Sequence, residues 1–301
     1  MKHHFADFLD RAGDYWTIIP NRERFAFIAD FEIADKDDVK ILTISKQQQK
    51  KHWEQVFDCL NLEELTLHDP SKEQVQAIRK LTNLRRIRVT FFRANDIEFI
   101  GDLINLEEVI LEYVSGFSDL QPLQKLKKLK SLQLENLRRV SNFDGLKGID
   151  SLRYLYIEGT LDWKQPIEDF TFLEGLQNLE VLAFGFVINK TEYPAFLPIL
   201  KLEKLKRVMI GAATFIAKEY AFIQAALPDV LCSNFGDNSW TTCYQINDDY
   251  MEFIGKGAGN VKLNNPKADE KIEAVKKQYE EYKREAEKII KAHLEIPSTA
   301  V

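Results

Sequence analysis

The 301-residue sequence has few cysteines and no long apolar run. Its three cysteines are odd in number and form no C-x-x-C pair, which argues against a disulfide framework. No stretch reaches about 18 apolar residues, so we expect no membrane-spanning helix. The N-terminal segment carries Asp7, Asp10 and Arg11, where a signal peptide would need an unbroken apolar run. These absences favour a reducing, cytoplasmic location.

The chain also lacks a large excess of one charge and lacks catalytic motifs. Its 41 Lys and Arg against 47 Asp and Glu give a net charge of −6, which does not favour general attraction to nucleic acid or anionic membrane. The glycine run Gly255–Asn260 lacks phosphate-loop spacing, so a hairpin turn is expected there. Cys243 has no His near it in sequence, and His52, His68 and His293 have no metal-ligand spacing. We expect no enzyme, metal or cofactor.

What the sequence does contain is a repeated strand frame, L-x-x-L-x-L. It recurs at Val39-Leu42-Ile44, Leu62-Leu65-Leu67, Leu84-Ile87-Val89, Leu106-Val109-Leu111, Leu129-Leu132-Leu134, Leu152-Leu155-Ile157, Leu179-Leu182-Phe184 and Leu205-Val208-Ile210, with a degenerate copy at Leu227-Val230-Cys232. Frames begin 22 or 23 residues apart, except that the spacing is 27 after Leu152 and 26 after Leu179. The repeat predicts stacked units that bury one continuous core.

A second apolar series lies nine, six and three residues before the leading residue of each frame. It runs through Trp53-Val56-Cys59, Val75-Ile78-Leu81, Ile97-Ile100-Leu103, Leu120-Leu123-Leu126, Phe143-Leu146-Ile149, Phe170-Leu173-Leu176 and Phe196-Ile199-Leu202. A strict period of three predicts short helical segments with close to three residues per turn, packed by one face on the core.

These two series resemble the leucine-rich repeat family, in the short class typified by internalins in bacterial-type proteins. The resemblance implies an α/β solenoid, a horseshoe with parallel strands on its concave face and 3₁₀ or short helices on its convex face. The chain departs from the family at the eighth residue after the leading residue, where Asn or Cys is usual. That position holds Pro70, Phe92, Val114, Leu137, Thr160, Val187 and Ala213, so other groups must satisfy the turn amides.

Both ends of a solenoid need caps. We expect an N-terminal cap at residues 1–38, the solenoid at 39–232 and cap strands at 233–265. The N-terminal cap should hold a helix at Phe5–Leu9 and a half-buried strand in which alternate residues face the core, namely Phe25, Phe27, Ala29, Phe31 and Ile33. The strands at 233–265 should surround the glycine turn.

An amphipathic helix and tail are expected at 266–301. Its apolar positions repeat at spacings of three and four, at Ile272, Val275, Tyr279, Tyr282, Ala286, Ile289 and His293. We expect this helix to lie against the end of the solenoid of a monomer. A homodimeric coiled coil is the alternative, although two tyrosines and an alanine make a poor symmetric seam.

The residues between the frame positions should face out from the concave side, where a leucine-rich repeat protein is expected to bind its partner. Glu112, Glu135 and Glu158 should form a row of like charges across neighbouring strands. We select as partner-binding residues Arg86, Arg88, Glu112, Glu135, Tyr154, Tyr156, Glu158, Trp163, Phe186 and Tyr193. Tyr and Arg dominate protein interfaces, although a mixed polar surface could also be mere cover for the sheet.

The two long spacings place insertions in neighbouring loops, within residues 160–195. Insertions in repeat proteins often mark the binding face, and Trp163 and Tyr193 lie in these two loops, where each could also cover its own loop. The sequence therefore predicts a non-catalytic module that binds a protein or peptide at the concave face and this loop edge. An acidic inhibitor or immunity-type protein that neutralises a basic enzyme, such as a toxin nuclease, is the alternative.

Overall fold

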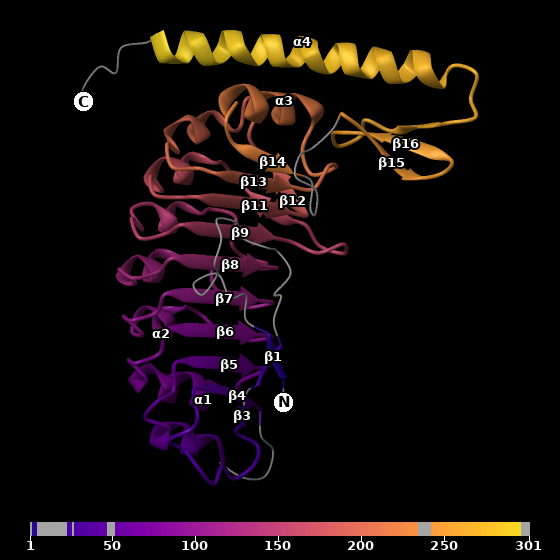
Figure 1. The fold of residues 1–301 in the computed structure, drawn as a ribbon. Coiled ribbons are helices and arrows are strands. Elements are labelled where there is room, and N and C mark those ends of the chain that lie inside the picture. Colours follow the sequence, from indigo (N-terminus) through magenta and orange to yellow (C-terminus); the bar gives the residue numbers. More distant parts are fainter. Residues whose placement is uncertain (1, 5–22, 26, 47–51, 234–241, 296–301) are drawn as a thin grey trace.

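The structure is a computed structural model that describes residues 2–4, 23–25, 27–46, 52–233 and 242–295. Its main feature is a ten-stranded parallel sheet (Figure 1). In spatial order the strands are β3 (Phe27–Ile28), β4 (Ile41–Ser45), β5 (Glu64–His68), β6 (Arg86–Thr90), β7 (Glu108–Glu112), β8 (Ser131–Glu135), β9 (Tyr154–Glu158), β11 (Val181–Gly185), β13 (Arg207–Ile210) and β14 (Leu231–Ser233).

The frame residues explain the register of this sheet. Leu132 on β8 is opposite Val109 on β7 and Leu155 on β9, and all three are fully buried. A slip by one residue would turn the leucines toward the other face, so the repeated frame fixes the pairing. The prediction of a leucine-rich repeat solenoid is confirmed, since each repeat adds one strand to a single continuous core.

The period-three series forms the predicted short helical segments. They are the 3₁₀ segments η1 (His52–Asp58), η2 (Ile78–Lys80), η3 (Gln121–Lys125), η4 (Asp144–Leu146), η5 (Thr171–Gly175) and η6 (Leu197–Lys201), and the short helices α1 (Lys72–Ala77) and α2 (Glu98–Gly101). Several begin at an Asx residue ten positions before the next leading leucine: Asp119 Oδ1, for example, accepts the backbone N–H of Gln121 at 2.8 Å. Asp96, Asn142 and Asp169 do the same. These side chains stop the chain from extending after each strand.

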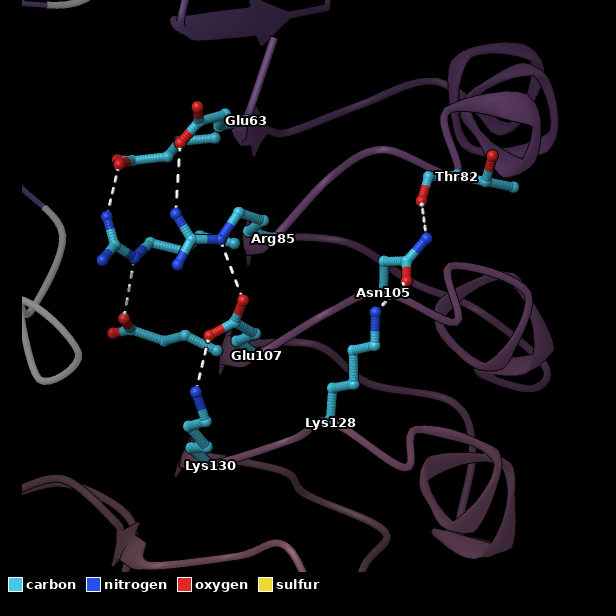
Figure 2. A network of polar contacts seen from close by, with 10 residues as sticks. Glu63, Thr82, Arg85, Asn105, Glu107, Lys128 and Lys130 are labelled. Carbon is cyan, nitrogen blue, oxygen red and sulfur yellow. Dashed lines mark hydrogen bonds and ion pairs between the residues drawn. The ribbon is translucent and has the colours of Figure 1, made fainter.

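The turn amides are satisfied without the family's usual Asn. Phe92, Val114 and Leu137 at the eighth position are buried in the core instead. The backbone N–H of Leu137 donates to the buried side chain of Gln165 at 3.0 Å. An Asn series does exist, but directly before the leading leucine: Asn105 Nδ2 donates to the Thr82 carbonyl of the preceding repeat at 2.8 Å (Figure 2).

The N-terminal strand is shorter than predicted. Strand β2 (Glu23–Phe25) pairs antiparallel with β1 (Lys2–His4), and β3 ends at Ile28. The alternation fails at Phe31, which is 69% exposed, because the chain turns after Ala29 and the side chain of Gln55 binds both Phe31 O and Ile33 N. The helix predicted at residues 5–9 lies outside the described residues.

The C-terminal strands, the glycine turn and the helix form where the sequence predicts them. β15 (Cys243–Asn247), β16 (Tyr250–Phe253) and β17 (Asn260–Lys262) form an antiparallel sheet, and the glycine run makes the β16–β17 turn with Gly255, Gly257 and Gly259 at positive φ. Helix α4 (Ala268–Glu295) lies across the end of the solenoid on α3 (Ala217–Ala226) (Figure 1). Tyr279 and Ala286 are buried there, and Lys218 of α3 pairs with Glu285.

Among the described residues, no helix is long and apolar enough to cross a membrane.

Candidate functional site

The outward-facing residues of the concave side are less exposed than the sequence predicts. Arg86 is 2% exposed and lies between Glu64 at 2.5 Å and Glu108 at 3.4 Å, and both carboxylates are equally buried. A buried charge is tolerated only when it is paired, and here one guanidinium serves two acids. Arg86 is therefore part of a packed layer and does not present its side chain to a partner in this arrangement.

Tyr154 and Tyr156 belong to a second apolar cluster on the same face. Tyr156 is 1% exposed and packs with Ile110, Val181, Ala183 and Met209, while Tyr154 is half-buried beside them. The small residues of β11 leave room for the tyrosine ring, since Ala183 is directly opposite Tyr156. Tyr156 is therefore packed within the concave face and is not available for contact with a partner, and Tyr154 is only partly accessible.

The predicted row of glutamates is present. Glu112, Glu135 and Glu158 are direct register partners on β7, β8 and β9. Arg88 holds Glu112 in a bidentate ion pair, in which Nη2 donates to Oε1 at 3.0 Å and Nε donates to Oε2 at 3.0 Å. No ion pair joins Glu135 or Glu158 to a cation in the described ranges. One end of the row is therefore neutralised, and the other end is not.

The electrostatics of the row follow from this imbalance. Burial raises the pKa of Glu135 to about 7, and the carboxylates of Glu112 and Glu158 on either side raise it too, against a lowering by Arg88. Burial also raises the pKa of Glu158, although the nearby Tyr156 hydroxyl lowers it. A cation placed beside Glu135 and Glu158 would lower the pKa of both carboxyl groups, because it favours their ionised form.

Three aromatic residues, which we call the aromatic column, lie beside the row, each directly after the last residue of a strand: β6, β7 and β11. Phe91, Tyr113 and Phe186 occupy this position with left-handed φ values of 56°, 54° and 47°, and they are 53%, 38% and 39% exposed. Phe91 stacks on Tyr113 with ring centroids 5.0 Å apart, and His68 meets Phe91 edge-on at 5.5 Å. Left-handed backbone costs a non-glycine residue about 1 kcal/mol, and large aromatic side chains are unusual there.

We call these six residues, Glu112, Glu135, Glu158, Phe91, Tyr113 and Phe186, the acidic–aromatic edge. All lie at the carboxyl ends of the parallel strands, where the chain leaves the sheet. The backbone N–H groups of Phe91 and Tyr113 donate to the next strand, to Glu112 O at 3.1 Å and Glu135 O at 3.0 Å, and the Phe186 carbonyl accepts the N–H of Gln165 at 2.9 Å. The backbone ladder thus fixes the positions of these side chains.

A groove of about 580 Å³ continues this edge toward the C-terminal cap. It is lined by Tyr156, Glu158, Leu161, Lys164, Phe186, Val187, Gly211, Ala212, Ala213, Thr214 and Tyr244. Leu161 is 82% exposed at its rim. A Cβ at Gly185 would lie 2.8 Å from Glu158 Oε1 and 3.1 Å from the Tyr156 hydroxyl oxygen, so only glycine leaves these two groups in place.

The two insertions meet at this edge of the sheet. Strands β10 (Gln165–Ile167) and β12 (Val187–Asn189) pair in parallel and form a small second sheet. Trp163 is half-buried in a tight loop closed by Thr160, whose N–H donates to the Trp163 carbonyl at 2.7 Å. Tyr193 lies elsewhere, edge-on to Phe222 of α3 and beside Lys218, so it joins the loop to the cap.

Sequence reasoning missed Phe91, Tyr113, Leu161 and Tyr244. The first two carried a usable signal, because the same frame position holds Asp69, Asn136 and Gly159 in other repeats. Those residue types tolerate left-handed backbone, so a Phe or Tyr among them indicates an exposed aromatic held under strain. Tyr244 reaches the groove from the C-terminal cap, which no repeat pattern covers.

The described residues hold no group of three or more His, Cys, Asp or Glu that could bind a metal ion. Cys59, Cys232 and Cys243 form no disulfide within the described residues, and burial raises the pKa of each thiol. A raised pKa makes a thiol a poorer nucleophile at neutral pH.

No protein-family model matches the chain. No curated protein matches it in sequence. Among solved structures it is similar to internalin C2 of Listeria monocytogenes, with 22% identity over 51% of this chain and 65% of that chain and a TM-score of 0.39. It is also similar to internalin F of the same organism, with 18% identity over 67% of this chain and 62% of that one and a TM-score of 0.43.

A third similar structure is the Toll–Spätzle complex of Drosophila, with 14% identity over 62% of this chain and 31% of that chain and a TM-score of 0.37. The chain thus spans less than two thirds of the length of each of these matches. The fold assignment rests on the chain's own repeat and sheet topology.

Proposed function

We propose that this leucine-rich repeat solenoid is a non-catalytic protein-interaction module whose acidic–aromatic edge and adjoining groove bind a basic segment of a partner protein. The observation that carries the proposal is Glu135, a carboxylate with no ion-pair partner among the described residues, set between two other acids and near the exposed rings of Phe91 and Tyr113. A partner's Lys or Arg would supply the missing charge.

Folding alone gives no reason for this arrangement. Aligned carboxylates repel one another, left-handed aromatic residues are strained, and exposed rings lose the benefit of burial. All three unfavourable terms fall on the acidic–aromatic edge: the repulsion among its three glutamates, and the strain and exposure of its three aromatic residues. A partner with a cation flanked by apolar groups would offset each of them, since aromatic faces also attract cations.

Several of the other residues predicted to bind the partner instead position the acidic–aromatic edge. Arg88 neutralises Glu112, so that within the described ranges the carboxylates of the row without an ion pair are Glu135 and Glu158. Tyr156 and Arg86 pack among the other side chains of the concave face and so restrict its movement. Trp163 shapes the loop that carries Leu161 at the rim of the groove. A rigid, preorganised surface loses less entropy on binding.

A basic enzyme held by the same edge is a narrower form of this proposal, and the acidic row favours it because the partner must supply positive charge. We propose a reducing cytoplasmic compartment as the location, since none of the three cysteines forms a disulfide within the described residues.

The test captures the partner from the native host, identifies it by mass spectrometry and measures binding of the purified pair. Leu161→Ala and Phe186→Ala should each weaken binding by about 1 kcal/mol or more. Leu60→Ala is the matched control, because Leu60 is 74% exposed and lies at the far end of the solenoid beside η1. Equal loss in the control, or full binding by both edge variants, would exclude this edge as the binding surface. A single partner whose activity stops on binding would identify an inhibitor.

A further inference from the structure

The opposite edge of the sheet carries a column of alternating charges. In the ten-stranded sheet, the residue before each strand from β4 to β13 is charged: Lys40, Glu63, Arg85, Glu107, Lys130, Arg153, Glu180 and Lys206. Figure 2 shows the middle of this column, where Arg85 binds Glu63 at 3.3 Å and Glu107 at 2.9 Å, and Lys130 binds Glu107 at 3.0 Å. Opposite charges on neighbouring strands attract, so the alternation stabilises the stack.

The alternation breaks once, at Lys130 and Arg153. These two cations are on adjacent strands, joined by the backbone N–H of Arg153, which donates to the Lys130 carbonyl at 2.9 Å. Their side chains separate: Lys130 pairs with Glu107 on one side, and Arg153 pairs with Glu180 at 3.4 Å on the other. The gap between them is flanked by positive charge and contains no carboxylate of the column.

A cavity of about 620 Å³ opens over this break. Its lining holds five cations, Lys127, Lys128, Lys130, Arg153 and Lys204, and three carboxylates, Glu107, Asp150 and Glu180. Glu107 and Glu180 are already shared by two cations each. Since five cations exceed three acids, the cavity is positive although the whole chain has a net charge of −6.

At this cavity the position of the Asn series described above holds Lys128, Ser151, Asn178 and Lys204, and neither lysine has a carboxylate partner among the described residues. Lys128 Nζ donates to the neutral amide of Asn105 at 2.7 Å, and Lys204 Nζ donates to that of Asn178 at 2.6 Å (Figure 2 shows Lys128 and Asn105). Ser151 occupies the same repeat position between them, and its buried hydroxyl has no hydrogen-bond partner among the described residues. Lys127 forms no ion pair within the described ranges.

We propose that this cavity is a binding site for a small ligand with two or more oxyanion groups, phosphate or carboxylate. Lys128 and Lys204 lie three repeats apart, about 14 Å at the usual strand spacing, with Ser151 and Arg153 between them. One oxyanion group would meet Lys127 and Lys128, and another would meet Arg153 and Lys204, with the Ser151 hydroxyl donating to either. Lys and Arg bind such groups by charge-assisted hydrogen bonds. The site is independent of the acidic–aromatic edge.

The experiment titrates the full-length chain by calorimetry with tripolyphosphate and, separately, with citrate, in buffer of constant ionic strength. The test variant is Lys127→Ser with Arg153→Ser, and the control is Lys40→Ser with Lys206→Ser. The control removes two positive charges, as the test variant does, and Lys206 shares Glu180 with Arg153, but neither control residue lines the cavity. Lys127→Ser alone serves if the double variant fails to fold.

We expect one saturable site in the wild-type chain, with an affinity that falls about threefold to tenfold in the test variant and stays within about twofold of wild type in the control. Tighter binding of tripolyphosphate assigns the site to phosphate, and tighter binding of citrate assigns it to carboxylates. Absence of saturable binding for both probes would overturn the proposal, and so would an equal loss in the control. Glu135→Gln should leave this binding unchanged, which separates the site from the proposed partner surface.

Discussion

Replacing Glu135 with Gln tests the electrostatics of the acidic row directly. Gln has nearly the shape of a protonated glutamate but cannot ionise, so the variant removes one charge and preserves the packing. In the folded chain the pKa of Glu135 is raised from 4.5 to about 7 by burial and by its acidic neighbours. Below pH 4.5 the carboxyl is protonated in both the folded and unfolded states, and the folded state loses nothing. Between pH 4.5 and about 7 the unfolded chain releases this proton while the folded chain retains it, so stability falls across that range and the loss is complete above the folded-state pKa.

The magnitude follows from that difference. A change from 4.5 to about 7 corresponds to at most about 3 kcal/mol. Glu135 is partly exposed, and solvent screening reduces the expected effect to about 1–2 kcal/mol. Glu135→Gln should therefore raise the free energy of unfolding by about 1–2 kcal/mol at pH 8 and by less than half as much at pH 5.

Urea unfolding of wild type and variant at both pH values measures this effect. Glu203→Gln is the control, since Glu203 is an exposed carboxylate on the turn after η6 and should change stability little at either pH. A destabilised Glu135→Gln at pH 8, or a gain that does not depend on pH, would refute the interpretation of the row as an unneutralised charge.

Three further outcomes are expected. Leu132→Ala should lower the free energy of unfolding by about 2–5 kcal/mol in urea melts, because Leu132 is fully buried in the frame; a loss below about 1 kcal/mol would contradict the shared core. Deleting residues 266–301 should lower stability by at least about 2 kcal/mol, since Tyr279 would leave α3; a truncated chain of equal stability that changes from dimer to monomer in light scattering would instead support a coiled-coil seam. Phe91→Asn should stay within about 1 kcal/mol of wild type, because relief of strain offsets the lost stacking, whereas Phe92→Asn should be strongly destabilising because Phe92 is buried; similar losses in both would refute the assignment of Phe91 to the surface.

The candidate site was predictable only in part. The row of Glu112, Glu135 and Glu158 follows from the period of the repeat, because equal frame positions must fall side by side in a parallel sheet. The burial of Arg86 and Tyr156 does not follow, since it depends on how outward side chains pack on one another. The position of Tyr193 was not predictable either: a loop of irregular sequence has no period, and here it packs on a helix that follows in the chain.

The sequence by itself determined the solenoid, the strand register and the short helical segments, because periodic apolar residues leave one way to bury a continuous core. It also determined that the glycine run is a turn and that the C-terminal segment is a helix. Only the tertiary structure decided which charges are neutralised, as Arg88 pairs with Glu112, while Glu135 has no ion-pair partner in the part of the chain that the structure describes. Only the tertiary structure placed Lys130 and Arg153 over a cavity and joined Tyr244 to the groove. Periodicity specifies which positions are neighbours, but the direction of a long side chain and the docking of a cap depend on contacts between residues far apart in the sequence.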